Sequence, residues 1–161
     1  MDRRQTLPPA GQGVHYATTP TRTANIGRRE AVEGIHDRPD QGVRIQAENG
    51  VVHMSLINIG PKAVFYQYKT SNNKTMRLFA IKTSDGEYRV AQNACDACYR
   101  KKMGYRQEGA DLVCNSCLRR TPSASVDTTT DDCAPRGIPR RIEGKALSIT
   151  AAELEARADL F

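Results

Sequence analysis

The chain has 161 residues, of which 26% are charged, and its formal net charge is +6 at neutral pH. Three Phe, six Tyr and no Trp provide limited aromatic material for a core, so we expect one modest domain. No apolar run approaches the roughly 20 residues of a membrane-spanning helix, and the first residues lack the apolar stretch of a signal peptide. We therefore expect a soluble chain, for which a leader or membrane tether would have to lie outside this sequence.

Residues 1–41 are rich in Pro, Gly, Thr and Arg and show neither helical nor strand periodicity. We expect this segment to be an extended or flexible arm. From residue 42 onward apolar and polar residues begin to alternate, which is the pattern of strands with one buried face. Residues 42–161 are therefore predicted to form a metal-binding β domain.

The alternating residues predict a series of antiparallel hairpins. Residues 43–47 and 51–57 flank Asn49-Gly50, a pair that tolerates the positive φ angles of a type I′ turn, so we predict a first hairpin there. Asp85-Gly86 predicts a second hairpin turn of the same kind. Further strands are expected at residues 63–68, 76–82, 88–91 and 111–113.

The C-terminal residues predict a last hairpin followed by a helix. The hairpin is expected at residues 142–147, around Gly144. Thr150 and Glu153 have the spacing of a capping box, and Leu154, Ala158 and Phe161 can share one face of the helix that follows. The predicted fold class is therefore mostly β, with antiparallel hairpins and a short C-terminal helix.

Four cysteines are set as Cys95-x-x-Cys98 and Cys114-x-x-Cys117. Each pair spans one tight turn, so both of its sulfurs can face the same ion. Thiolates are soft ligands that select zinc, monovalent copper, iron or iron–sulfur centres. We predict that these four residues bind one metal centre. Two structural disulfides are the alternative, which the odd fifth residue, Cys133, makes less tidy.

Cys133 has several interpretations. It could be a fifth ligand, a thiol that exchanges for one of the four, a redox-active partner, or a small buried apolar residue. Tyr99 and Tyr105, close to the cysteine pairs, are interpreted as packing residues that shield the site from water.

Basic residues gather around the cysteines. They could balance the negative charge of the metal thiolates, or they could form a surface that binds an acidic redox partner or, with less weight, nucleic acid. These residues are Arg100, Lys101, Lys102, Arg106, Arg119, Arg120, Arg136, Arg140 and Arg141.

The motifs from about residue 43 to residue 161 resemble one family. They include both cysteine pairs, the block of residues 104–109, Gly-Tyr-Arg-Gln-Glu-Gly, and Cys133-x-Pro135. Together they are similar to the FtrD-like domain, the membrane-associated iron–sulfur protein of bacterial ferrous-iron uptake systems. The resemblance implies an exported and usually membrane-tethered redox protein that works beside an iron permease.

The order of strands and cysteine loops also resembles a Rieske domain. In this Rieske-like arrangement Cys98 and Cys117 stand where histidines bind the cluster, and Cys133-Ala134-Pro135 falls where a proline loop covers it. The fifth sulfur would then lie close to the metal. A two-iron cluster bound only by thiolates is expected near −400 mV, about the value of plant-type ferredoxins.

These observations favour an iron–sulfur electron-transfer protein associated with iron uptake, in the periplasm or otherwise outside the cytoplasm. The expected partners are an iron permease or an acidic redox protein, and contact with the membrane is expected only through a tether. The alternatives are a zinc-ribbon-like structural module that binds nucleic acid or protein, and a protein that handles monovalent copper. The sequence lacks a nucleophile elbow and a phosphate loop, so a redox carrier is favoured over a catalyst.

Overall fold

Strand β4, Thr75–Lys82, lies at the centre of the fold and is buried on both faces. Successive side chains of a strand point to opposite faces, so Met76 and Leu78 point one way while Phe79 and Ile81 point the other. All four are at most 1% exposed, and the two pairs belong to separate apolar clusters. The strand therefore lies between two layers of structure, each of which covers one of its faces.

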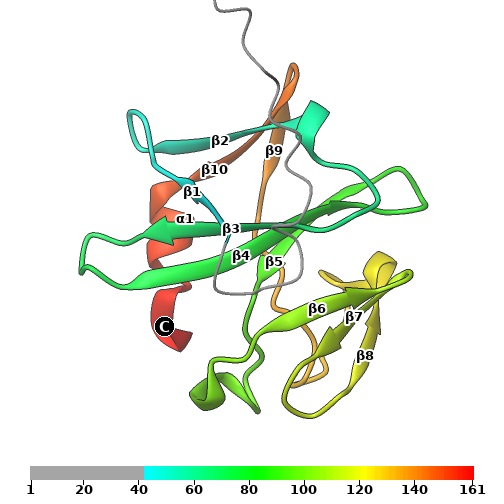
Figure 1. The fold of residues 1–161 in the computed structure, drawn as a ribbon. Helices are drawn as coiled ribbons and strands as arrows, with labels where there is room; N and C mark the ends of the chain where they lie inside the picture. Colours follow the sequence, from blue (N-terminus) through cyan, green and yellow to red (C-terminus); the bar gives the residue numbers. More distant parts are fainter. Residues whose placement is uncertain (1–41) are drawn as a thin grey trace, which may run out of the picture. The chain divides into compact units, whose positions relative to one another are not determined.

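The computed structural model describes residues 42–161, all of which belong to one compact unit (Figure 1). The predicted arm, residues 1–41, lies outside the described residues. The central sheet has the strand order β1-β3-β4-β5, in which β1 is parallel to β3 and the other pairs are antiparallel. Its other strands are β1, Val43–Ile45; β3, Val64–Lys69; and β5, Tyr88–Gln92.

The second sheet covers one face of the central sheet, together with the C-terminal helix (Figure 1). Its strands are β2, Val51–Ser55; β10, Ala146–Thr150; and β9, Arg141–Glu143, in that order. Helix α1, Ala151–Glu155, follows β10 directly, and its Leu154 is fully buried. This layer buries Tyr66 and Tyr68 of β3 as well as Met76 and Leu78 of β4.

The third sheet belongs to the opposite apolar cluster, which also contains three of the five cysteines as buried members. Its strand order is β6-β7-β8, with β6 at Tyr105–Glu108, β7 at Asp111–Cys114 and β8 at Arg120–Pro122. Four short 3₁₀ turns complete the described chain: η1, Leu56–Asn58; η2, Tyr99–Lys101; η3, Ser123–Ser125; and η4, Ala158–Leu160.

The first predicted hairpin is wrong in its pairing, although its turn is correct. Asn49 and Gly50 have φ angles of 51° and 80°, and Glu48 and Val51 exchange backbone hydrogen bonds of 2.8 and 3.0 Å across the turn. Beyond the turn, however, β1 pairs with β3 and β2 pairs with β10. A turn signal is local, whereas strand pairing depends on where the apolar side chains can be buried. Met54 of β2 is only 2% exposed because it packs in the core between the two sheets.

The other predicted strands and the C-terminal helix are confirmed, and so is the mostly β fold class. The hairpin of β9 and β10 turns at Gly144, whose φ is 61°. Thr150 accepts a hydrogen bond of 3.2 Å from the backbone of Glu153, as a capping box requires, but the Glu153 carboxylate pairs with Arg157 instead of a backbone donor. Strands β6 and β8 were not predicted. Among residues 42–161, no helix has the length and apolar character needed to span a bilayer.

The turn between β4 and β5 is held by a network of bonds around Asp85. Its carboxylate accepts hydrogen bonds from the Thr83 hydroxyl and, at 3.1 Å, from the backbone of Glu87, and it pairs with Arg89 at 2.7 Å. The Thr83 hydrogen bond first, and then the Arg89 hydrogen bond, lower the pKa of Asp85 to about 2. Gly86, with φ of 86°, allows the chain to reverse here.

Candidate metal site

The fold brings the five cysteines together from three segments. Cys95 and Cys98 follow β5, and Cys114 is the last residue of β7, with Cys117 in the turn after it. Cys133 lies in the long connection between η3 and β9. Because Tyr105 is paired with Cys114 in the β6–β7 ladder, the first cysteine loop returns directly to the strand that carries the second.

Four of the sulfurs form a compact group. The Sγ atoms of Cys95, Cys98, Cys114 and Cys133 all lie within 4.8 Å of one another. The Sγ atom of Cys95 is 3.7 Å from that of Cys114 and 3.9 Å from that of Cys133. Two thiolates bound to one tetrahedral ion at about 2.3 Å are about 3.8 Å apart, so these separations are those of a four-thiolate metal site.

Cys117 differs from the other four cysteines because its side chain is exposed and its sulfur lies outside this compact group. The Cys117 Sγ atom is 2.6 Å from the Cys133 Sγ atom. All five cysteines are free thiols, so the structure contains neither of the two structural disulfides that were considered as an alternative. Proximity of the fifth sulfur, Cys133, to the predicted site is confirmed, whereas the identity of the ligands stays a prediction.

The backbone of Cys133 is held in place by hydrogen bonds at both its N–H group and its carbonyl group. Its backbone N–H donates a 2.9 Å hydrogen bond to the Asp131 carboxylate, and its carbonyl accepts one of 2.7 Å from the Tyr105 hydroxyl. Tyr105 is only 1% exposed, and its own backbone N–H donates to the Asn93 side chain at 2.6 Å. The position of Cys133 is therefore set by one buried and one partly buried hydrogen bond in addition to any metal.

The supporting roles of Tyr105 and Asn93 were only partly visible in the sequence. The packing role that was predicted for Tyr105 is confirmed by its burial, but its hydrogen bond to the Cys133 carbonyl joins residues 28 positions apart. Asn93 is buried directly under Gly104, where a Cβ atom would lie 2.6 Å from the Asn93 side chain. Its position two residues before Cys95 was the one available sign of a role at the site.

Several of the basic residues near the cysteines pair with carboxylates. Arg136 lies 2.8 Å from Asp96 in the first cysteine loop, and Arg119, in the turn after Cys117, pairs with Asp131 of the Cys133 segment. These ion pairs join separate cysteine-bearing segments. Elsewhere Arg106 and Arg120 pair with Glu108, while Arg140 pairs with Asp127.

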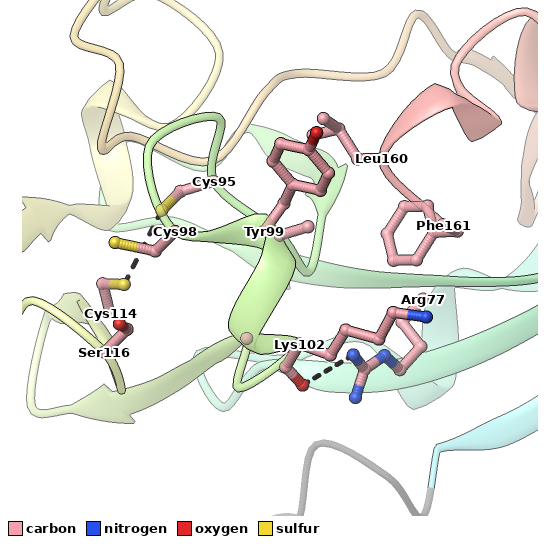
Figure 2. A pocket seen from close by; sticks show the side chains of 11 residues that line it. Arg77, Cys95, Cys98, Tyr99, Lys102, Cys114, Ser116, Leu160 and Phe161 are labelled. Carbon is pink, nitrogen blue, oxygen red and sulfur yellow. Dashed lines mark hydrogen bonds between the residues drawn. The ribbon is translucent and has the colours of Figure 1, made fainter.

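Four of the nine basic residues have no such partner among the described residues: Arg141 on β9, and three consecutive residues of the first cysteine loop. Arg100, Lys101 and Lys102 are exposed on η2 and at its end, and in the described part of the chain their charged groups form no ion pair or hydrogen bond. The Lys102 backbone carbonyl, in contrast, accepts a 2.7 Å hydrogen bond from Arg77 (Figure 2). The first cysteine loop thus presents a cluster of uncompensated positive charge.

The thiols differ in acidity because their surroundings differ. Burial, followed by hydrogen bonds to Cys98 and Cys114, raises the pKa of the Cys95 thiol, and burial likewise raises the pKa of Cys133. Burial opposes ionisation of Cys117, but hydrogen bonds from Cys133, the Arg119 backbone, Cys114 and Cys98 together lower its pKa to about 7. Burial, followed by the charge of Cys95, raises the pKa of Tyr105 far above its ordinary value, so its hydroxyl remains a hydrogen-bond donor.

The space beside the sulfurs is almost filled. Figure 2 shows the side chains of Cys95, Cys98 and Cys114 directed toward one another, while Tyr99 is turned toward the C-terminal residues. The cavity that these residues line has room for about one water molecule. An organic substrate could not enter there, so the arrangement is suited to holding a metal in a protected environment.

Comparison with known proteins agrees with this chemistry. The family model described as membrane iron-sulfur containing protein FtrD-like matches residues 60–161, which include all five cysteines. A search of curated proteins found no match.

Proposed function

Because the chain belongs to the FtrD-like family of membrane iron-sulfur containing proteins, we propose that it is an electron-transfer protein with a thiolate-bound iron–sulfur centre. The observation that carries the proposal is the compact group of four sulfurs within 4.8 Å of one another. Thiolates are the donors that hold iron–sulfur centres, although the spacing of these four sulfurs is that of ligands on a single ion, so a cluster would require the cysteine loops to move apart. When bound, such a centre would supply reversible one-electron transfer.

The surrounding residues favour a carrier over a catalyst. Cys95 and Cys114 are each 2% exposed, so the interior side of the site is closed to water. Cys98 is half-buried, and the Cys117 turn is exposed, which leaves one edge of the site close to the surface. Electron transfer needs a protected centre near a surface at which a partner can dock, and it needs no substrate cavity.

We infer an acidic redox partner from the charge beside this edge. Arg100, Lys101 and Lys102 are exposed and unpaired in the described structure, and the exposed apolar side chains Met103 and Leu118 lie on the two cysteine loops. The Asn115 side chain ties these loops together through a 2.9 Å hydrogen bond to the Met103 carbonyl. Exposed apolar side chains together with exposed basic ones suit contact with an acidic protein surface.

The partner can be tested by reversing one charge. K101E should slow electron transfer to an acidic acceptor protein at low ionic strength, because steering depends on the summed charge near the docking site. K145E is the matched control, since Lys145 is an exposed residue of the β9–β10 turn. Equal slowing by both variants would show that net charge alone, and no docking surface at the site, sets the rate.

The same family membership supports a place in iron uptake outside the cytoplasm, beside a permease. Loss of the protein should then slow growth of its host only when iron is scarce, and growth with ample iron should be unaffected. Unchanged iron accumulation in cells that lack the protein would argue against this association.

The iron–sulfur centre itself is tested by anaerobic purification of the full chain. We expect a coloured protein with thiolate-to-iron absorption that bleaches with dithionite, and iron and acid-labile sulfide analyses give the number of iron atoms. A colourless protein that contains stoichiometric zinc would instead identify a structural module, and copper loading with luminescence would identify a copper(I)-handling protein. Either result would refute the electron-transfer proposal.

A further inference from the structure

We propose that Cys117 is a reserve thiol outside the ligand set, and that its disulfide with Cys133 opens the metal site under oxidising conditions. The inference rests on the proposed metal site and revises the ligand set expected from the two Cys-x-x-Cys pairs. Its starting point is a count: a tetrahedral ion and an iron–sulfur cluster each take four protein ligands, whereas the site contains five thiols.

The geometry indicates which thiol is the extra one. Cys133 belongs to the group of four sulfurs that lie within 4.8 Å of one another, and Cys117 does not. Cys133 is 8% exposed and is fixed by the hydrogen bonds from its N–H to Asp131 and from the Tyr105 hydroxyl to its carbonyl. A ligand whose position is already fixed loses less conformational entropy when it binds the metal.

Cys117 lies in a different environment. It is exposed in the turn between β7 and β8, where the neighbouring Leu118 has a φ angle of 62° and a side chain that is 63% exposed. Two backbone hydrogen bonds close this turn, from Leu118 to Cys114 and from Cys114 to Arg119, and Asn115 at its start is bonded to Gly104 and Met103. In the described part of the chain, however, no contact covers the Cys117 side chain from solvent. Cys117 is therefore the thiol that a soluble oxidant reaches first.

The position of Cys117 gives it one preferred disulfide partner. Its sulfur also interacts with those of Cys98 and Cys114, but the separation from Cys133, 2.6 Å, is shorter than the 3.7 Å between Cys95 and Cys114 and the 3.9 Å between Cys95 and Cys133. A sulfur that is bonded to Cys117 is no longer available to the metal as a thiolate, because the thiolate is the form that binds. Oxidation of this pair therefore removes one of the four ligands.

The chemistry balances with a small-molecule disulfide as the oxidant. The Cys117 thiolate attacks the oxidant and forms a mixed disulfide, which releases one thiol of the oxidant. The Cys133 sulfur then attacks the Cys117 sulfur and releases the second thiol. The two protein thiols lose two electrons and two protons in total, and the oxidant is reduced to two thiols.

The test compares C117S with C98S in the full chain, purified without oxygen. Both variants remove the second cysteine of a Cys-x-x-Cys pair, so they are matched. We expect C117S to retain the iron content and visible absorption of the unmodified protein, whereas C98S should retain less than a tenth of the iron. If C117S loses iron as C98S does, Cys117 is a ligand and the proposal is wrong.

The second part of the test adds glutathione disulfide to the metal-loaded proteins. The unmodified protein should lose its absorption as a Cys117–Cys133 link appears in non-reducing peptide mapping, and C117S should lose it at least tenfold more slowly. Equal rates would overturn the proposal. Should the unmodified protein contain no iron, the proposed function fails, but mapping of the oxidised metal-free chain still decides the pairing: a Cys117–Cys133 link supports it, and a different link overturns it.

Discussion

The hydrogen bond from Tyr105 to the Cys133 carbonyl provides the sharpest test of how the fold supports the site. The substitution Tyr105→Phe keeps the ring, which packs against Phe79 at a centroid distance of 6.4 Å, and removes only the hydroxyl. That hydroxyl donates to the Cys133 carbonyl at 2.7 Å, and both residues are buried. The change therefore leaves a buried carbonyl without its donor.

Leaving a buried acceptor without its donor lowers the free energy of unfolding by about 1–3 kcal/mol. This loss is larger than the net contribution that a typical intramolecular hydrogen bond makes to stability. For a chain of about this size, that loss corresponds to a decrease in Tm of about 2–12 °C. We also expect Cys133 to react faster with an alkylating reagent in Y105F than in the unmodified protein, because one of its two backbone anchors is gone.

The assay is thermal or urea unfolding of the metal-free chain under reducing conditions, followed by the rate of Cys133 alkylation. Tyr66→Phe is the matched control, because Tyr66 is 6% exposed and its hydroxyl has no hydrogen-bond partner among the described residues. If Y105F is as stable as Y66F and its Cys133 is no more reactive, the hydrogen bond does not hold the Cys133 segment and the reasoning fails.

Two further substitutions test the turns beside and away from the site. Gly104→Ala and Gly109→Ala both place a side chain at a φ angle near +64°, a cost of about 1–2 kcal/mol, but only the former brings a Cβ within 2.6 Å of Asn93. Urea unfolding should therefore show an additional loss of about 1–3 kcal/mol for G104A, and equal midpoints would contradict the contact. Asp85→Asn tests the β4–β5 turn: because the folded-state pKa of Asp85, about 2, lies below its unfolded value of about 3.9, its stabilisation is present above pH 4 and is lost as the pH falls toward 2. The Tm difference between D85N and the unmodified protein should thus shrink from pH 5 to pH 2, and a difference that stays constant over this range would contradict the role of the Asp85 carboxylate.

The features that could be read from the sequence are those set by neighbouring residues. Positive φ angles at Asn49, Gly86 and Gly144 follow from residue types that tolerate them, and the turns formed where they were predicted. The cap at Thr150 depends on residues three positions apart, so it too was predictable. Strands with alternating apolar residues were found for the same reason.

The pairing of those strands was decided by the tertiary structure. The short strand β1 pairs in parallel with β3, and β2 crosses to β10 near the end of the chain, about 95 residues away, as the pairing of His53 with Ser148 shows. Such pairings depend on which apolar faces can be buried together, and no local pattern records this. Strands β6 and β8 were missed because each is short and rich in polar residues.

By itself, the sequence indicated that thiols gather where a metal could bind, because Cys-x-x-Cys spacing places two sulfurs on one turn. Only the tertiary structure decided which sulfurs meet. The loop that carries Cys133 folds back over β6 and is held there by the Tyr105 hydroxyl, which brings the isolated fifth cysteine into the group of four and leaves Cys117 at its edge. The physical reason is that the spacing of a motif constrains only residues that are close in sequence. The burial of Tyr105 and Cys133, in contrast, depends on the packing of the whole core.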